Sequence, residues 1–172
     1  MSYAVQATTA VAPIVVGIGD GAVSAAPGAR LKTYGLGSCI GIVIVDPASG
    51  VTSLTHVALP DSRLNQTLAE QKPFHFADTA IRLIVQRMLA SGAAPKKALW
   101  RMKLAGGASV LKNSDHFDIG KRNLLAVKKA LWTQGMAALA EHVGGSHSRT
   151  VLVTVASLDV SIHLGTGQVV QL

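Results

Sequence analysis

Helical periodicity is confined to two segments of this chain, and that restriction limits the folds open to it more than any other feature. Residues 78–91 place apolar side chains at i, i+3, i+4, i+7 and i+8, the stripe of an amphipathic helix. Asp78 suits the start of this helix and Gly92 its end. A second stripe begins after Asp118, a capping residue, and stops at Gly135.

Short β-branched or alternating runs bounded by turn residues predict the strands. They lie at 13–18, 40–45, 51–57, 98–104, 136–143, 151–155, 160–164 and 168–171. Loops are predicted at the glycine-rich stretch 17–28 and at 59–73. We therefore predict an α+β fold with a mixed sheet and two main helices on one side. No linker divides the chain, so we expect one domain, with an N-terminal segment 1–29 that carries the first strand and a main part 30–172.

Composition excludes several classes of protein. Apolar residues make up 49% of the chain and charged residues 15%, which provides a core and excludes intrinsic disorder. Cys39 is the only cysteine, so no disulfide can form within the chain. No stretch of ~18 uncharged apolar residues is present, so we expect no membrane insertion. The N-terminus lacks the basic region of a signal peptide, and we expect a cytoplasmic protein.

The positive charge is concentrated in one segment. The whole chain has a net charge of +7, and residues 96–129 carry all of that excess. Such a cluster favours an acidic partner, which could be nucleic acid, an anionic membrane or an acidic protein, or it forms a solvated face. Because there is no zinc motif, no aromatic stacking pair on a strand and no Arg-rich tail, we expect no nucleic-acid partner.

We expect neither a cofactor nor a metal. The glycines at 17, 19 and 21 lack both the following helix and the spacing of a dinucleotide-binding loop, so they indicate a turn. The histidines show no HExxH motif and no cluster at ligand spacing. They are His56, His75, His116, His142, His147 and His163.

Cys39 follows a glycine loop and precedes a predicted strand, which suits either a buried structural cysteine or a nucleophile. Suppose that 40–45 and 50–57 form a hairpin with 46–49 as a four-residue loop. Val45 then pairs with Gly50, and the same register places Cys39 opposite His56. Residues directly opposed on two strands share a face, with Cβ atoms ~5 Å apart. The sequence thus predicts a Cys–His pair that depends on this register.

A thiol beside an imidazole can act as a nucleophile. An unperturbed thiol has a pKa of about 8.5, and the imidazole can take its proton. A third group must orient the imidazole, and Thr33 or Ser38 could supply it. Gly35 and Gly37 would let backbone N–H groups approach a developing oxyanion. Together these residues suit acyl transfer from an amide or an ester.

Around these residues the chain resembles the CheD family of chemoreceptor glutamine deamidases. The resemblance covers about residues 30 to 155 and depends on the order and spacing of several motifs. They are L-K-T-Y-G-L-G-S-C at 31–39, D-P at 46–47, T-H-V-A-L-P-D-S-R at 55–63, F-A-D-T-A-I at 76–81, K-L-A-G-G-A at 103–108, F-D-I-G-K-R-N at 117–123 and V-G-G-S-H-S-R-T at 143–150.

The resemblance implies a hydrolase that converts receptor glutamine side chains to glutamate and releases ammonia, with possible methylesterase activity. It implies a catalytic triad of Cys39, His56 and Thr33. It also implies a layered fold, so we expect an α/β/β sandwich. Some members have a CheC-type phosphatase as partner, but Ala105 stands where the family often has phenylalanine.

Two further expectations concern partners. Receptor helices rich in glutamate and glutamine could bind the basic segment, so we regard four cations as candidates for substrate binding. They are Lys121, Arg122, Lys128 and Lys129. The alternative function is a regulatory binding module that docks to a phosphatase or a receptor with little catalysis.

Overall fold

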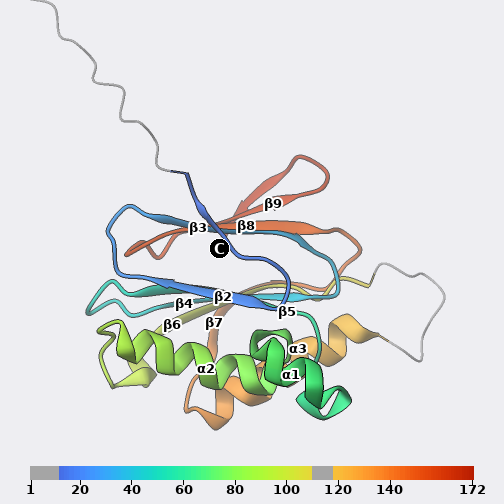
Figure 1. Ribbon diagram of the computed structural model, residues 1–172. Helices are drawn as coiled ribbons and strands as arrows, with labels where there is room; N and C mark the ends of the chain where they lie inside the picture. The colour runs from blue at the N-terminus through green and yellow to red at the C-terminus, as the bar shows by residue number, and fades with distance from the viewer. Residues whose placement is uncertain (1–11, 110–117) are drawn as a thin grey trace, which may run out of the picture.

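In the computed structural model, which describes residues 12–109 and 118–172, two β-sheets and a layer of helices are stacked on one another (Figure 1). The first sheet contains β1 (Ile14–Val15), β3 (Arg30–Leu36), β8 (Arg149–Thr154), β9 (Val160–Leu164) and β10 (Val169–Gln171). The second contains β2 (Asp20–Ser24), β5 (Thr52–Val57), β4 (Ile40–Val45), β6 (Arg101–Gly106) and β7 (Ala138–Val143). The α-helices are α1 (Gln66–Gln71), α2 (Ala77–Ala90) and α3 (Ile119–Thr133), and short 3-10 helices lie at Ser62–Leu64, Pro73–His75 and Lys97–Leu99.

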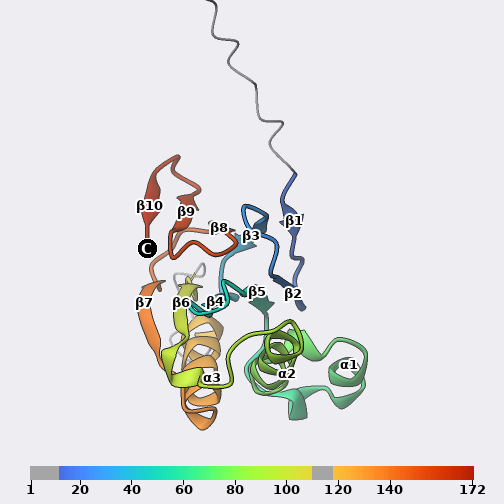
Figure 2. The ribbon, with the colours of Figure 1, turned by 90° about the vertical axis from the view of Figure 1, so that its left-hand side faces the viewer.

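Both sheets are mixed, and all three α-helices lie on the outer side of the second sheet (Figure 2). In the first sheet β1 is parallel to β3 and the other pairs are antiparallel. In the second sheet β6 is parallel to β7 and the other pairs are antiparallel. The predicted α/β/β sandwich with two main helices on one side is therefore confirmed.

Strand β4 is the centre of the sandwich, and all six of its residues are buried. Its side chains alternate between the two cores, as the period of a strand requires. Ile40, Ile42 and Ile44 belong to the core under the helices. Val43 and Val45 belong to the core between the sheets. Burial on both faces explains why this strand is a continuous apolar run in the sequence.

The two long helices occupy the predicted segments. Asp118 caps α3 by accepting a hydrogen bond from the Lys121 backbone N–H at 3.0 Å, as predicted. The capping role predicted for Asp78 is wrong, because the N-cap residue of α2 is Phe76 and Asp78 lies in the first turn. Within the described ranges, no helix combines the length and the apolar character that a membrane crossing requires.

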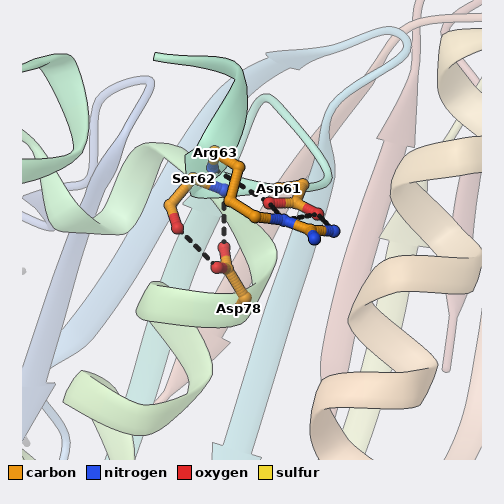
Figure 3. A network of polar contacts seen from close by, with 4 residues as sticks. All are labelled: Asp61, Ser62, Arg63 and Asp78. Atoms are coloured by element: carbon orange, nitrogen blue, oxygen red, sulfur yellow. Dashed lines mark hydrogen bonds and ion pairs between the residues drawn. The ribbon is translucent and has the colours of Figure 1, made fainter. Parts of the chain in front are cut away.

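Asp78 instead anchors the loop that follows β5 (Figure 3). Its carboxylate accepts hydrogen bonds from the Ser62 backbone N–H at 3.0 Å and from the Ser62 hydroxyl at 2.6 Å. Beside it, Arg63 donates to Asp61, and this pairing lowers the pKa of the Asp61 carboxyl to about 2. The loop leading away from His56 is thus tied to α2.

Several predicted loops contain regular structure. The stretch 17–28 includes β2, and part of the predicted glycine loop before Cys39 is the end of β3. The stretch 59–73 includes α1, which Asn65 caps through the Leu68 N–H at 2.9 Å. Glycine content misleads here, because β2 is stabilised by pairing with β5 within the second sheet and β3 by pairing with β8 within the first. The first predicted strand, 13–18, is shorter than expected. The division into segments 1–29 and 30–172 stays a prediction, and residues 1–11 lie outside the described part.

Gly106 ends β6 in a conformation that only glycine adopts easily, and it touches the segment that carries Cys39. Its φ is +115°, and an added Cβ would lie 2.1 Å from the Cys39 carbonyl oxygen. We therefore expect Gly106→Ala to lower the free energy of unfolding by at least about 3 kcal/mol, measured by urea denaturation.

Gly28→Ala is the matched control for that substitution. Gly28 has a φ of +78°, but an added Cβ there meets nothing within 4 Å. We expect a loss of only about 1–2 kcal/mol, from backbone strain alone. Equal losses at the two positions would contradict a close approach of Gly106 to Cys39.

Candidate functional site

The three residues of the predicted triad come from two strands and the residue before a third, and they meet between the two sheets. Thr33 lies on β3 of the first sheet, and its side chain is fully buried. His56 lies on β5 of the second sheet and is 1% exposed. Cys39 directly precedes β4, is half-buried and packs against the core between the sheets. The site is therefore assembled by the stacking of the layers.

A hydrogen-bonded chain of Val16, Thr33 and His56 determines the tautomer of the imidazole. The Thr33 hydroxyl donates its only proton to the Val16 carbonyl oxygen at 2.7 Å, because a carbonyl can only accept. The Thr33 oxygen, 2.8 Å from His56 Nδ1, must then accept a hydrogen bond from that nitrogen. The proton of neutral His56 is thus on Nδ1, and Nε2 carries a free lone pair.

The predicted hairpin register is wrong by two residues. Gly41, not Cys39, lies opposite His56, and Val45 pairs with Thr52. The connection between the two strands is residues 46–51, six residues rather than four, and the Asp46 backbone N–H closes its base by donating to the Val51 carbonyl at 2.9 Å. The buried Asp46 carboxylate also accepts hydrogen bonds from Ser49 and Ala94, which holds this longer turn in place.

A shift of two residues keeps every side chain on its face. Continued by one residue beyond β4, the observed register pairs Cys39 with Ala58 and makes Cys39 a diagonal neighbour of His56. Diagonal neighbours on an antiparallel pair are ~7–8 Å apart, more than directly opposed residues. In agreement with this separation, His56 Nε2 is buried and forms no hydrogen bond with any described residue, Cys39 included.

Burial keeps both members of the pair uncharged. Burial lowers the pKa of His56 to about 4, and the nearby His75 adds a smaller effect in the same direction. Burial also raises the pKa of the Cys39 thiol, and a hydrogen bond from its own backbone N–H opposes this rise in part. At neutral pH the resting pair is a thiol and a neutral imidazole rather than an ion pair.

The segment that carries Cys39 is held by the end of β6 and the residues after it. The Cys39 carbonyl accepts a hydrogen bond from the Gly107 N–H at 2.9 Å, and the Gly37 carbonyl accepts one from Ala108 at 2.7 Å. The Gly37 N–H donates to the Gly35 carbonyl at 2.9 Å. Ser38, the alternative group for orienting the imidazole, is partly exposed. His56 Nδ1 forms its hydrogen bond with Thr33 instead.

Sequence reasoning overlooked the contacts of two residues beside the site and of a third, buried residue on β8. Asn123 on α3 is fully buried and donates to the backbone on either side of the Cys–His pair. His75 lies close enough to His56 to affect its pKa. Arg149 is 4% exposed, and its guanidinium holds the loop after β7 through the Gly144 and His147 carbonyls. The motifs around Asn123 and Arg149 were visible in the sequence, but their contacts were not.

The four candidate cations all lie on the exposed side of α3 but do not form one uniform patch. Lys128 forms an ion pair with Glu141 on β7 at 2.8 Å. Arg122 and Lys129 line a groove of about 460 Å³ that Asp61 and Asp78 also line. Within residues 12–109 and 118–172, no three His, Cys, Asp or Glu residues come together as a metal site would require.

The low pKa of His56 has a consequence for stability. Between about pH 6.5 and pH 4 the unfolded chain binds a proton at this histidine that the folded protein does not bind. The free energy of unfolding should therefore fall as the pH falls through this window. We expect His56 to account for roughly 3 kcal/mol of that loss, measured by urea denaturation at a series of pH values.

His56→Gln is the control, because glutamine does not titrate. Other groups with lowered pKa values also contribute to the wild-type profile, so the difference between the two profiles isolates His56. Parallel profiles for wild type and His56→Gln would show that His56 is not buried in its neutral form.

Comparison with known proteins agrees with this arrangement. The family described as CheD chemotactic sensory transduction matches residues 58–164. The chain is 42% identical to the probable chemoreceptor glutamine deamidase CheD of Syntrophotalea carbinolica, over 91% of each chain. It is 42% identical to the protein of the same name from Solibacter usitatus, over 84% of each chain. A third protein of that name, from Caldanaerobacter subterraneus, is 42% identical over 79% of this chain and 83% of its own.

The family match begins after His56, but the similarity to the Syntrophotalea protein extends further toward the N-terminus. Coverage of 91% of this chain leaves too few residues outside the alignment to omit Thr33, Cys39 or His56. With identity at this level over almost the whole length, the chain belongs to the CheD family of chemotactic sensory transduction proteins.

Proposed function

We propose that this protein hydrolyses the side-chain amides of particular glutamines in chemoreceptors to glutamate, with release of ammonia, and so takes part in chemotaxis adaptation. The relatives that match almost the whole chain carry the name of this activity. One structural observation supports it most strongly, namely the hydrogen bond between Thr33 and His56. Because it leaves His56 Nε2 unprotonated, this nitrogen can accept a proton from a nucleophile.

In the first half of the reaction Cys39 would attack the glutamine amide carbon. His56 Nε2 takes the thiol proton as the carbon–sulfur bond forms, since the resting pair is neutral. The imidazolium that results is stabilised by its Nδ1–H bond to Thr33. It then returns the proton to the departing nitrogen, so the carbon–nitrogen bond breaks and ammonia leaves behind a thioester on Cys39.

In the second half water would hydrolyse the thioester. His56 Nε2 takes a proton from the water as its oxygen attacks the acyl carbon, and the proton goes to the Cys39 sulfur as the carbon–sulfur bond breaks. The products are a receptor glutamate and the free thiol. A receptor glutamyl methyl ester could enter the same acyl-enzyme, with methanol as the leaving group, which would account for methylesterase activity.

The glycine loop before Cys39 would stabilise the oxyanion of each tetrahedral intermediate. We assign this role to the segment of Gly35, Gly37 and Ser38. The Gly37 N–H already donates to the Gly35 carbonyl, so the Ser38 amide is the better candidate for direct contact. Fixed backbone donors of this kind require no reorganisation during the reaction.

The outer face of α3 would bind the acidic receptor helices in the cytoplasm. Four cations lie on this exposed face, and they can attract a glutamate-rich helix over a long range. The helix begins beside the site, because Asn123 in its second turn contacts the carbonyl before Cys39. A receptor helix along α3 could therefore present a glutamine to the thiol.

The mass of a purified receptor cytoplasmic fragment tests the reaction. Deamidation should add about one mass unit per site and release ammonia, and Cys39→Ala should abolish both. Thr33→Val removes the hydroxyl at constant shape and should lower kcat by about 100-fold or more, because His56 loses its orientation. Thr33→Ser keeps the hydroxyl and should retain most of the activity.

Failure of this test would have a clear meaning. If neither wild type nor Cys39→Ala changes the fragment mass and both still bind it, the protein is a regulatory module. It would then dock to a receptor or to a CheC-type phosphatase without catalysis. Equal activity of Thr33→Val and wild type would contradict only the role of Thr33 and would leave the proposed reaction intact.

Charge reversal on α3 tests the docking face. Lys121→Glu combined with Arg122→Glu should weaken binding of the receptor fragment about tenfold or more and reduce its dependence on salt concentration. The control is Arg82→Glu on α2, an exposed cation outside the four proposed for binding. An unchanged affinity and salt dependence in the double variant would place the receptor elsewhere.

A further inference from the structure

Asn123 is a buried polar residue that the proposed mechanism does not use. It lies on α3 with no exposed surface, and its side-chain Nδ2 donates two hydrogen bonds. The acceptors are the Ser38 carbonyl at 3.0 Å and the Ala58 carbonyl at 2.8 Å. Carbonyl oxygens only accept, so the orientation of the amide is determined by these contacts.

The two acceptors lie just beyond the end of a ladder. The last pair between β4 and β5 joins Ile40 to Val57, and the next positions along the same register are Cys39 and Ala58. Asn123 therefore bridges the two strands at the point where their own pairing stops. One acceptor precedes Cys39 directly, and the other comes two residues after His56.

These two hydrogen bonds take the place of backbone hydrogen bonds between the strands, at the end of the hairpin where Cys39 lies. The thiol must come closer to His56 Nε2 during the reaction, since the two atoms share no hydrogen bond at rest. Without the bridge, the ends of the two strands could separate. A displacement of ~1 Å is enough to reduce a reaction rate by about 100-fold.

We propose that Asn123 is a positioning residue that sets the separation of Cys39 from His56 by tying the Ser38 and Ala58 carbonyls together. The predicted effect on catalysis rests on the proposed deamidase function. The bridge itself is independent of the substrate. Its effect should appear in any reaction of the Cys39 thiol that His56 assists.

The rate of Cys39 alkylation by iodoacetamide measures that assistance directly. Cys39 is the only cysteine, so the reaction reports on one thiol. His56→Gln should slow alkylation in the wild-type background and have little further effect in the Asn123→Ala background. Such non-additivity in a double-mutant cycle would show that Asn123 couples the two residues, which a merely stabilising role would not do.

Deamidation kinetics provide the second readout. Asn123→Ala should lower kcat by about 10- to 100-fold with KM changed less than twofold. Asn123→Asp has the same shape but replaces two N–H donors with at most the single O–H of a buried neutral carboxyl, so it cannot bridge both carbonyls and should be impaired. Asn123→Ser keeps one donor and should be intermediate. The matched control is Asn65→Ala, which removes an asparagine that caps α1 and should leave kcat unchanged.

Each outcome has a definite reading. Additive effects of His56→Gln and Asn123→Ala on alkylation, with an unchanged kcat, would overturn the proposal even if the melting temperature falls. If Asn123→Ala does not fold, Asn123→Ser and Asn123→Asp take its place, and wild-type rates in both would overturn it. If wild type deamidates no receptor, the proposed function fails, while the alkylation cycle still tests the bridge.

Discussion

The burial of β4 on both faces is the constraint on which the rest of the structure depends. A strand with apolar side chains in both directions needs two separate covers. One face is covered by α2 and α3, and the other by the first sheet. This demand produces the three layers. It also brings β3 over β5, and that crossing joins Thr33 to His56 across the two sheets.

The same burial shapes the chemistry available to the site. Burial between the sheets disfavours charge, so the thiol of Cys39 and the imidazole of His56 are neutral at rest. The hydrogen bond to Thr33 determines which imidazole nitrogen can accept the thiol proton, because it leaves Nε2 as the only acceptor. A neutral pair of this kind would also limit unwanted reactions of the thiol before a substrate arrives.

Sequence patterns predicted the elements whose periodicity is local. The stripe of α2, the Asp118 cap of α3 and the apolar run of β4 were all predicted. Strands β2 and β3 were not, because their glycines indicate turns and only pairing with strands distant in sequence, within each sheet, makes them strands. The face of the Cys39–His56 hairpin could be predicted but not its pairing, since a shift by two residues preserves the face and the pattern does not distinguish the two registers.

The sequence by itself determined the α+β class through its apolar periodicity, and its motifs in their order and spacing indicated the family, from which the layered fold and the candidate triad were predicted. Only the tertiary structure decided the hairpin pairing, the tautomer of His56 and the contacts of Asn123. These depend on groups distant in sequence, such as Val16 near Thr33 and Ser38 near Asn123. The distances between these groups are determined by how the layers pack, and no local sequence pattern predicts them.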